Sequence, residues 1–322
     1  MPVPIPRPVV TEAQAKELSL ALREISPDCS KFHLLGTTPY GKVYRVHHKT
    51  LNRLVALKLV ECEKTEDGVS TNVYRSSEDG PPKDFTILES LSHPNILRIL
   101  STYRGGTGFS TNIFSEFVAG GTLFDYGQRE LQTQSLLGGA THRPGLSELS
   151  CRDIIYQLCQ AMAYVHRQGI VHRNLKLDNI FISGDAPFIK VAGFGLATHV
   201  PPAGLLTEIR GSMEYMAPEM MSVAEPGYNC TADVWAVGIM MFELLVLDIP
   251  YKSSRTYPEY TPPKLRWDLF LEEGRQLSDH GVEFLAGLLS VDPAARLSME
   301  GALEHPWLMY HRPIYPNVVY PQ

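Results

Sequence analysis

Residues 171–179 of the chain read VHRNLKLDN, and residues 191–197 read VAGFGLA. The first segment carries the polar side chains of Asn174, Lys176 and Asn179, and the second has a glycine, Gly193, immediately before a phenylalanine. The amide of Asn174 can accept a hydrogen bond but cannot take up a proton near neutral pH, and Gly193 has no side chain with which to bind a ligand. Chemistry that needs a proton acceptor at residue 174 or a metal ligand at residue 193 is therefore impaired.

The length of the chain favours two lobes or domains. At 322 residues and 36.0 kDa it exceeds what one hydrophobic core usually holds. Its 29 basic and 35 acidic residues give a formal net charge of −6, and it has no basic block suited to a phosphate backbone or an anionic membrane. We therefore expect neither nucleic acid nor a membrane surface as a partner.

The cysteine pattern and the absence of targeting features favour an intracellular protein, in the cytoplasm or the nucleus. The 5 cysteines are scattered and include no C-x-x-C pair, so reduced, buried and inert thiols are expected. The longest apolar run, residues 235–247, is interrupted by Glu243 and is shorter than the roughly 20 residues of a membrane span. It predicts a central core helix. The N-terminus, MPVPIPRPVV, does not have the pattern of a secretory signal.

The first third of the chain predicts a small sheet with one helix. Apolar and β-branched runs predict a strand that ends at Leu35, strands over 43–46 and 54–60, and two strands that flank the Gly-rich turn 104–108. Residues 85–91 have helical spacing. A further helix is predicted over 11–25, and the polar segment 64–83 is predicted to be a long loop.

Beyond Gly120 the pattern becomes mainly helical. Apolar repeats predict helices through 154–165, 234–247 and 284–289, and the polar segment 128–148 is interpreted as an insertion between helices. The tail after Trp307 is too rich in proline to continue a helix. We therefore divide the chain into an N-terminal extension with a helix (1–31), an N-lobe (32–118), a C-lobe (119–308) and a C-terminal tail (309–322).

From residue 32 to residue 308, the order and spacing of several motifs resemble the eukaryotic protein-kinase family. The motifs are LGTTPYGKV at 35–43, VALK at 55–58, VHRNLKLDN, VAGFGLA, APE at 217–219 and DVWAVG at 233–238. LFDY at 123–126 and LEHPWL at 303–308 resemble the calcium/calmodulin-dependent Ser/Thr kinases. The resemblance implies an α+β, bilobal fold with a small, mainly antiparallel β N-lobe, one key helix within it, and a larger, mainly α C-lobe.

The same resemblance assigns roles to the residues of the two opening segments. In the family, one aspartate accepts the proton of the substrate hydroxyl and another holds magnesium. Asn174 stands at the position of the base and Gly193 at that of the metal ligand. Lys176 and Asn179 match the remaining polar residues of the catalytic loop.

A nucleotide site is also implied by the resemblance. Lys58 matches the lysine that reaches the α- and β-phosphates, and Asp84 stands where the family has its glutamate partner. Phe181 would lie beneath adenine and either stack on the purine or fill its place. Pro39 removes one N–H donor from the loop over the phosphates. The implied nucleotide-site residues are Gly36, Thr38, Gly41, Val43, Ala56, Lys58, Asp84, Ser115, Glu116, Val118 and Phe181.

Several residues match scaffold positions of the family. Arg296 is expected to pair with Glu219, and Asp233 is expected to hold the catalytic loop by its backbone. A stacked apolar spine is expected from His172, Phe194, Leu88 and Ile99.

The resemblance also implies a phosphate beside Arg173. In the family this arginine often meets a phosphate on the activation segment, and Thr207 and Ser212 are the hydroxyls best placed to carry it.

Two functions remain in view. The first is a pseudokinase, a signalling scaffold or allosteric regulator of protein partners such as an active kinase or its substrate, with weak ATP binding and no magnesium. The alternative is an active Ser/Thr protein kinase that transfers the ATP γ-phosphate with Asn179 and a displaced acid, Asp178 or Asp185. No metal site is expected elsewhere, because the pair His47 and His48 has no carboxylate or cysteine at ligand spacing.

Overall fold

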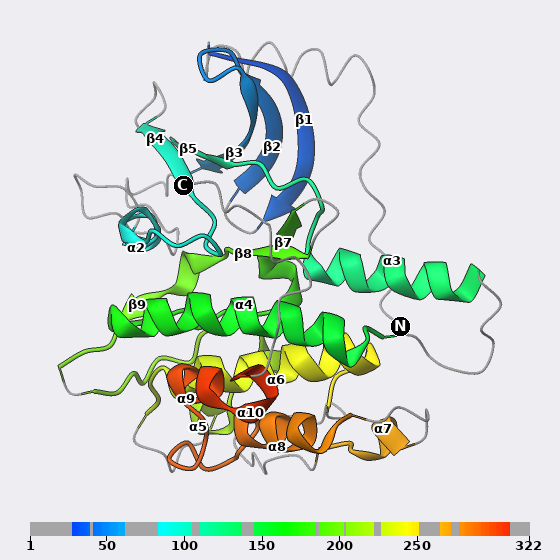
Figure 1. Cartoon of the computed structure of the whole chain (residues 1–322). Coiled ribbons are helices and arrows are strands. Elements are labelled where there is room, and N and C mark those ends of the chain that lie inside the picture. The colour runs from blue at the N-terminus through cyan, green and yellow to red at the C-terminus, as the bar shows by residue number, and fades with distance from the viewer. Residues whose placement is uncertain are drawn as a thin grey trace. The chain divides into compact units, whose positions relative to one another are not determined.

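The computed structural model divides the chain into two compact units (Figure 1). Unit 1 comprises residues 1–89 and 97–117, and unit 2 comprises 90–96 and 118–322. The structure describes residues 28–38, 41–61, 83–104, 110–136, 145–183, 187–202, 204–221, 227–250, 265–271 and 277–309. The predicted helix over 11–25, nearly all of the predicted loop 64–83 and the tail from residue 310 lie outside these ranges.

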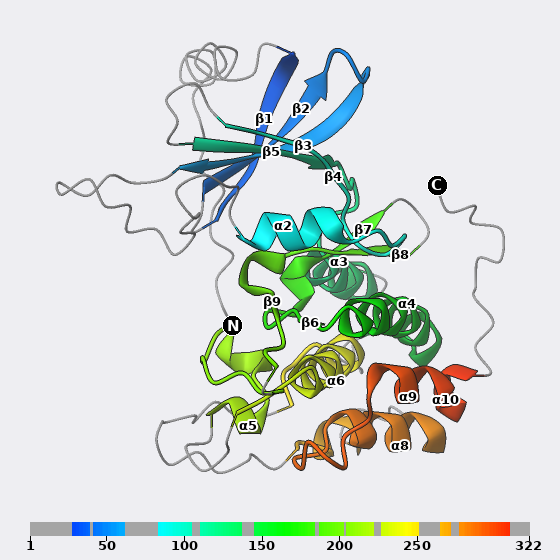
Figure 2. The ribbon, with the colours of Figure 1, turned by 90° about the vertical axis from the view of Figure 1, so that its left-hand side faces the viewer.

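Unit 1 is built on an antiparallel sheet with the strand order β1-β2-β3-β5-β4. Its strands are β1 (Cys29–Thr38), β2 (Gly41–His48), β3 (Arg53–Glu61), β4 (Ile99–Arg104) and β5 (Ser110–Glu116). Figure 2 shows the twist of this sheet. Helix α2 (Lys83–Ser90) follows β3 in the chain. The predicted strands and helix are confirmed, and β1 runs three residues past Leu35 because Thr38 still pairs with Gly41 of β2.

The two faces of this sheet differ in chemistry. One face forms a core in which Tyr44, Leu57 and Phe114 lie on adjacent strands at matching register. The pleat sends alternate residues to the other face. There Val43 pairs with Lys58 across β2 and β3. The sheet therefore presents Lys58 on the side away from its main core.

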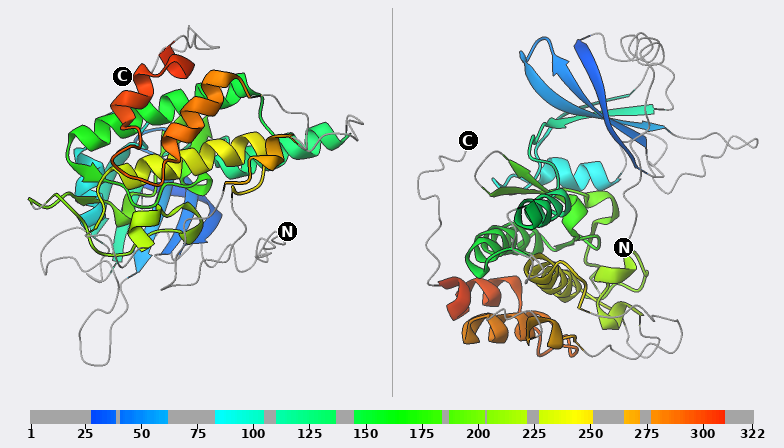
Figure 3. Two further views of the ribbon diagram at one scale, coloured as in Figure 1. Left: turned by 90° about the horizontal axis from the view of Figure 1, so that it is seen from below. Right: turned by 90° about the vertical axis from the view of Figure 1, so that its right-hand side faces the viewer.

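Unit 2 is mainly helical. Its helices are α3 (Leu123–Leu136), α4 (Glu148–Arg167), α5 (Pro218–Met221), α6 (Thr231–Val246), α7 (Asp268–Leu271), α8 (Asp279–Leu288), α9 (Met299–Glu304) and α10 (Pro306–Met309). Helices α4 and α6 lie side by side (Figure 2). Figure 3 shows α8, α9 and α10 packed along them. The core of unit 2 lies between these helices.

Helix α6 confirms the prediction of a central core helix. Nearly all of its side chains are buried, and it ends where Leu247 adopts a left-handed conformation with φ 56°. Helix α4 is capped at its N-terminus by Ser147, whose side chain accepts a hydrogen bond of 3.1 Å from the backbone N–H of Ser150. Within the described ranges, no helix is long and apolar enough to cross a membrane.

The interpretation of segment 128–148 as an insertion is wrong for residues 128–136, which continue helix α3. The hydroxyl of Thr122 accepts from the N–H of Asp125, and the carboxylate of Asp125 accepts from the N–H of Thr122. This reciprocal cap starts the helix. Residues 128–132, QRELQ, are good helix formers. Gln128, Arg129 and Gln132 are exposed, so the polarity here belongs to a helix surface rather than a loop.

The expected buried thiols are present at Cys29, Cys151 and Cys159, which are fully buried. Burial raises the pKa of Cys159 to about 12, so its thiol stays protonated and unreactive. Cys230 is free and half-buried, and Cys62 lies outside the described residues.

Candidate functional site

The catalytic loop runs from β6 (Ile170–Val171) to the 3₁₀ turn η1 (Leu177–Asn179) and is held by Asp233 at the start of α6. The backbone N–H groups of His172 and Arg173 donate to its carboxylate at 2.8 and 2.9 Å. The ring nitrogen Nε2 of His166 lies 2.9 Å from the same carboxylate. Burial alone would raise the pKa of Asp233, but the hydrogen bond and charge of His166 lower it. The predicted anchor is confirmed.

His172 links the catalytic loop to the glycine-containing turn. Its Nε2 lies 2.9 Å from the carbonyl oxygen of Ala192, and its Nδ1 accepts from the N–H of Asn174 at 3.2 Å. The ring meets that of Phe194 edge to face, with centroids 4.5 Å apart. Burial lowers the pKa of His172. A neutral ring with its proton on Nε2 satisfies both contacts. The contacts of His172 therefore connect segment 171–179 with segment 191–197.

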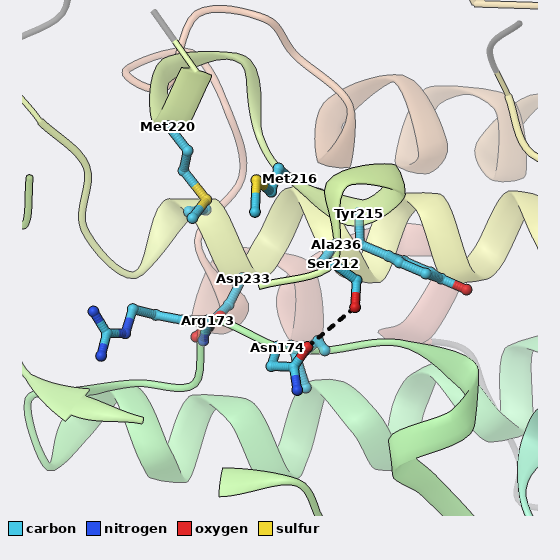
Figure 4. A pocket seen from close by; sticks show the side chains of 10 residues that line it. Arg173, Asn174, Ser212, Tyr215, Met216, Met220, Asp233 and Ala236 are labelled. Carbon is cyan, nitrogen blue, oxygen red and sulfur yellow. Dashed lines mark hydrogen bonds between the residues drawn. The ribbon is translucent and has the colours of Figure 1, made fainter. Parts of the chain in front are cut away.

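Asn174, at the position of the base, is held on two sides. Its side-chain Oδ1 accepts a hydrogen bond of 3.3 Å from the hydroxyl of Ser212 (Figure 4). Its backbone carbonyl accepts one of 2.7 Å from Nδ2 of Asn179. Asn174 and Asn179 are thus brought together within the loop, and both are oriented by local hydrogen bonds.

Gly193 precedes the 3₁₀ turn η2 (Phe194–Leu196) and has a left-handed backbone with φ 82°. A Cβ at this residue would lie 2.5 Å from Nδ2 and 2.7 Å from Oδ1 of Asn179. The amide of Asn179 therefore fills the space that a side chain at residue 193 would need. In the part of the chain that the structure describes, no group of three or more His, Cys, Asp or Glu residues is placed to hold a metal ion. Gly193 therefore offers no side-chain ligand at the position where the family holds magnesium.

Of the two substitute acids considered from sequence, the structure describes Asp178 but not Asp185. Asp178 is exposed, and its charge contributes to the raised pKa values of Tyr215 and Glu243. Burial is the larger cause in both and raises the pKa of Glu243 to about 7. The hydroxyl of Tyr215 donates to Glu243 at 2.6 Å. Asp178 thus acts on this pair, and Asp185 lies outside the described residues.

Arg173 is occupied by the activation segment. It has φ 65°, and its Nε donates to the carbonyl oxygen of Leu196 at 2.5 Å. Its guanidinium lies 3.7 Å from the carboxylate of Glu208, whose backbone carbonyl accepts from the hydroxyl of Tyr228 at 2.6 Å. A carboxylate thus lies where the sequence predicted a phosphate. Glu208 was missed, although an acidic residue next to Thr207 was the available signal.

A small pocket lies between the catalytic loop and the activation segment (Figure 4). Its volume of about 10 Å³ holds roughly one water molecule. It is lined by Arg173, Asn174, Leu175, Ser212, Tyr215, Met216, Met220, Ala232, Asp233 and Ala236.

The predicted nucleotide residues of unit 1 gather on one face of its sheet. Val43 lies opposite Lys58, and Ala56 lies opposite Ser115, so the four side chains share the face away from the main core. Lys58 and Ala56 are half-buried, and Ser115 is 8% exposed. The side chain of Asp84 lies outside the described residues, so its pairing with Lys58 stays a prediction.

Of the two glycines in segment 35–43, Gly41 is required by the backbone geometry and Gly36 is not. Gly41 has φ 134°, and a Cβ there would overlap the backbone carbonyl of Leu59. Around Gly36, by contrast, a Cβ would meet nothing within 4 Å. Thr38 donates to the carbonyl oxygen of Gly41 at 2.9 Å. Pro39 is not among the described residues.

The other predicted nucleotide residues are Glu116 at the end of β5, Val118 just after it, and Phe181 within β7. Glu116 closes β5 and accepts from the N–H of Arg98 at 2.9 Å. Val118 is half-buried in unit 2. Phe181 lies in β7 (Ile180–Ser183), which pairs with β8 (Phe188–Val191), and it is half-buried.

The spine and scaffold residues are found within their own units. Leu88 is buried in unit 1, and Ile99 packs against Val60 and Ile113 there. In unit 2, the guanidinium of Arg296 and the carboxylate of Glu219 form a bidentate ion pair, which confirms the predicted pairing of these two residues.

This fold, with an antiparallel sheet in one lobe and helices in the other, and this loop arrangement define a protein kinase domain. The model of the protein kinase domain matches residues 29–308, and the chain belongs to the protein kinase family. It is 28% identical over 283 residues to Aurora kinase of Saccharomyces cerevisiae and 29% identical over 287 residues to the liver/testis phosphorylase b kinase gamma catalytic chain of Bos taurus. It is 27% identical over 290 residues to the human serine/threonine-protein kinase DCLK3.

These alignments cover 88%, 85% and 85% of this chain. They cover 70% of the yeast protein, 64% of the bovine protein and 39% of the human protein. The match is therefore to the kinase domains of larger relatives.

Proposed function

We propose that the protein is a pseudokinase, a kinase-fold protein with little or no phosphotransfer that acts as a scaffold or allosteric regulator of protein partners. One observation carries the proposal. An amide, Asn174, stands at the position of the base, and the space beside Gly193 is filled by the side chain of Asn179. The scaffold contacts of Asp233 and of Arg296 with Glu219 are meanwhile complete. The fold is kept and the acid chemistry is lost.

The expected loss of rate is large. A general base contributes roughly 10²- to 10⁴-fold, and a metal ion contributes several kcal/mol of charge stabilisation. A combined loss of about 7 kcal/mol corresponds to roughly 10⁵-fold in rate. Kinases turn over at about 1 to 100 s⁻¹, so the remaining rate would be negligible for signalling.

Weak ATP binding without magnesium is part of the proposal. Lys58 and Ala56 share one face of the unit 1 sheet with Val43 and Ser115. A lysine on a small-residue face suits phosphate oxygens beside a purine, and the backbone of residues 35–43 offers N–H donors. Gly193 offers no ligand to a metal that would neutralise the phosphates. Affinity is then limited to what Lys58 and backbone groups provide.

A phosphotransfer assay with purified protein tests the proposal. We expect no transfer above background from ATP to a generic Ser/Thr protein substrate or to the chain itself, with magnesium or manganese. Lys58→Met is the matched control because it removes the predicted phosphate contact outside the catalytic loop. Turnover that Lys58→Met abolishes would support the alternative of an active Ser/Thr kinase with Asn179 and a displaced acid.

The partners and the compartment follow from the same proposal. With a formal net charge of −6 and no basic block, the chain suits protein partners rather than nucleic acid or anionic membranes. The kinase or the substrate that such a regulator would bind is intracellular, in the cytoplasm or the nucleus. Co-purification of an active kinase or its substrate from cells, lost on destabilising unit 2, tests this part.

A further inference from the structure

We infer that the face of strands β1 and β2 away from the main core binds an acidic segment of a protein partner, through His33, Arg45 and His47. These three residues form the basic cluster of unit 1. The inference rests on the proposed function for the expectation of a protein partner, and it adds the chemistry by which the partner would be recognised. Its basis is the direction of the three side chains, their contacts and the charge of the strands around them.

Residues 31–59 are basic, although the formal net charge of the whole chain is −6. They contain three histidines and no Asp or Glu. Their lysines and arginines are Lys31, Lys42, Arg45, Lys49, Arg53 and Lys58. These cations are spread singly along the sequence, which therefore contains no basic block. The sheet of unit 1 is what gathers some of them on one surface.

On β2, Arg45 and His47 point away from the main core of unit 1. Tyr44 and Val46 are buried in this core, and successive residues of a strand point to opposite faces. Arg45 and His47 are two residues apart, which corresponds to about 7 Å along a strand. Leu54 of β3 lies opposite His47 and is 44% exposed. This end of the face is therefore open to solvent.

On β1, a shift in register brings His33 to the same face. Phe32 and Leu34 pack against the main core, and the exposed His33 lies between them. His33 pairs directly with Arg45. The register shifts just before His33, where Lys31 has φ 55°, and without this bulge Phe32 would stand opposite Arg45. Directly opposed residues have Cβ atoms about 4.5 to 5.5 Å apart, so His33 and Arg45 are neighbours on one surface.

An aromatic ring holds the guanidinium of Arg45. Its Cζ lies over the ring of Phe117, 5.9 Å from the ring centroid. A guanidinium over a ring keeps the N–H groups at its edge available for a carboxylate. Within the described ranges, none of the three side chains of the basic cluster forms an ion pair or a hydrogen bond. Their donors are therefore positioned and available.

The acidic residues of the neighbouring strands lie outside the basic cluster. Glu116 stands opposite Val55, which belongs to the main core, so its side chain starts from the other face of the sheet. Glu61 is at the end of β3 remote from Leu54. Asp28 precedes β1, and its backbone carbonyl accepts from the N–H of the exposed Lys49. The face around the cluster therefore carries positive charge without a carboxylate between its members.

This arrangement fits the carboxylates of an extended peptide. Arg45 can bind one carboxylate through two N–H groups, and the imidazoles of His33 and His47 offer further donors on either side. Alternate side chains of an extended peptide are also about 7 Å apart, which matches the spacing of Arg45 and His47. Long polyanions such as nucleic acid would be repelled by the rest of this acidic chain. An acidic protein segment is therefore the favoured occupant.

Fluorescence anisotropy with two labelled peptide libraries tests this inference at pH 7. Each member of the first library has four Asp or Glu residues among eight, and the second has Asn or Gln in their place. We expect the acidic library to bind at least about tenfold more tightly in 50 mM salt. In 0.5 M salt the two should agree to within about twofold, because salt screens exposed charges.

Variants of the basic cluster locate the binding surface. Arg45→Gln should reduce the preference for the acidic library at least about fivefold, and His33→Gln combined with His47→Gln about threefold. Arg53→Gln is the matched control, because it makes the same substitution in the same sheet. Arg53 stands opposite His48, whose ring packs against Phe114 of the main core. This control should keep the preference to within about twofold.

Equal binding of the two libraries to the wild type overturns the inference, and so does an equal loss in Arg45→Gln and Arg53→Gln. Loss of the preference in Lys58→Met would assign the acidic peptide to the predicted nucleotide residues and overturn it too. The same holds if polyuridylate or phosphatidylserine vesicles bind through Arg45 more tightly than the acidic library. A dimer in sedimentation that Arg45→Gln dissociates would assign the face to a second copy of the chain instead.

Circular dichroism melts equal to the wild type show that each variant is folded. If Arg45→Gln does not fold, the double histidine variant still decides, since it leaves the contact of Arg45 with Phe117 in place. Turnover in the phosphotransfer assay contradicts the proposed function, whereas an inactive protein without a preference for acidic peptides contradicts only this inference.

Discussion

The side-chain amide of Asn179 donates a 2.7 Å hydrogen bond to the backbone carbonyl of Asn174, and in this position it closes the space beside the glycine at residue 193. The absence of an acidic side chain at residue 193 therefore leaves no empty space, because the hydrogen-bonded side chain of Asn179 occupies it. Restoring an acid at residue 193 requires that this hydrogen bond move or break.

Gly193→Ala should lower the free energy of unfolding by about 2 to 3 kcal/mol. Left-handed backbone costs a non-glycine residue roughly 1 kcal/mol, and displacing the amide of Asn179 adds a lost hydrogen bond of about 1 kcal/mol. Gly204→Ala is the matched control, because Gly204 has the same φ of 82° and a Cβ there would meet nothing within 4 Å. Urea denaturation measures both.

Gly204→Ala should therefore lower the free energy of unfolding only by the cost of placing alanine in left-handed backbone, roughly 1 kcal/mol. Because Asn179→Ala already lacks the hydrogen bond to Asn174, adding Gly193→Ala to that variant should also cost only this backbone term. Equal costs for the two alanine variants would show that Asn179 moves freely and that the space beside Gly193 is open.

Arg296→Ala should lower the melting temperature markedly, through a loss of about 3 to 5 kcal/mol. Its guanidinium bonds the carboxylate of Glu219 at 2.6 and 2.9 Å and also donates to the carbonyl of Thr231. Removing the arginine leaves a buried carboxylate without its counter-charge. Calorimetry measures the change. Arg167→Ala is the control, since Arg167 and Glu300 form an exposed pair at 3.9 Å and should contribute less than about 1 kcal/mol. Similar melting curves for the two variants would contradict the prediction.

Stability should fall as pH rises from about 4.5 to 7 through the titration of Glu243, whose folded pKa is about 7 against an ordinary value of 4.5. Burial is the main cause, and Asp178, Asp248 and Glu214 add to it against the hydrogen bond from Tyr215. In this window the native state binds more protons than the unfolded state, so the slope of stability with pH is negative. The full effect is at most about 3 kcal/mol.

Glu243→Gln removes this titration and keeps an acceptor for Tyr215. The difference in melting temperature between wild type and Glu243→Gln, followed from pH 5 to pH 8, isolates the effect from histidine titrations. We expect the variant to gain relative to the wild type as pH rises. A constant difference across this range would show that Glu243 is ionised throughout.

Glu208→Ala should increase the rate of tryptic cleavage after Arg210 several-fold. The carboxylate of Glu208 lies 3.7 Å from the guanidinium of Arg173 and 3.5 Å from that of Arg210. In the pair with Arg173, the side chain of the arginine is 10% exposed and that of the glutamate is 66% exposed. The pair should therefore order this segment locally and contribute less than about 1 kcal/mol to the free energy of unfolding.

Thr207→Glu in the Glu208→Ala background tests whether a charge at the exposed Thr207 can replace the lost carboxylate. Recovered protection would support the expectation that a phosphate on this segment meets Arg173. Glu214→Ala is the control, because Glu214 is also exposed on this segment but forms no ion pair with a described residue. If all these variants were cleaved at the rate of the wild type, the contact with Arg173 would not order the segment.

The sequence predicted those features that depend on local pattern or on motif order. The strands of unit 1, helix α6, the anchor Asp233 and the pair of Arg296 with Glu219 follow from periodicity or from family spacing. Residues 128–136 were misinterpreted because a run of polar helix formers resembles a loop in composition. The role of Glu208 and the position of the Asn179 side chain beside Gly193 depend on contacts between separate loops, which no local pattern records.

Addition of ATP should raise the melting temperature slightly and equally in EDTA and in magnesium. A ligand that binds only the native state stabilises it by RT ln(1 + [L]/Kd), about 2.7 kcal/mol at one hundred times Kd. Lys58, half-buried on the sheet face of unit 1, remains to contact the phosphates, whereas Gly193 cannot hold the metal. Thermal shift therefore detects binding without assuming catalysis.

Lys58→Met should abolish the thermal shift, whereas Lys49→Met, which removes an exposed lysine of the same unit, should keep it. No shift at millimolar ATP would mean that Phe181, Thr38 or Pro39 closes the nucleotide site. A large shift only with magnesium would contradict the interpretation of Gly193 and favour an active kinase.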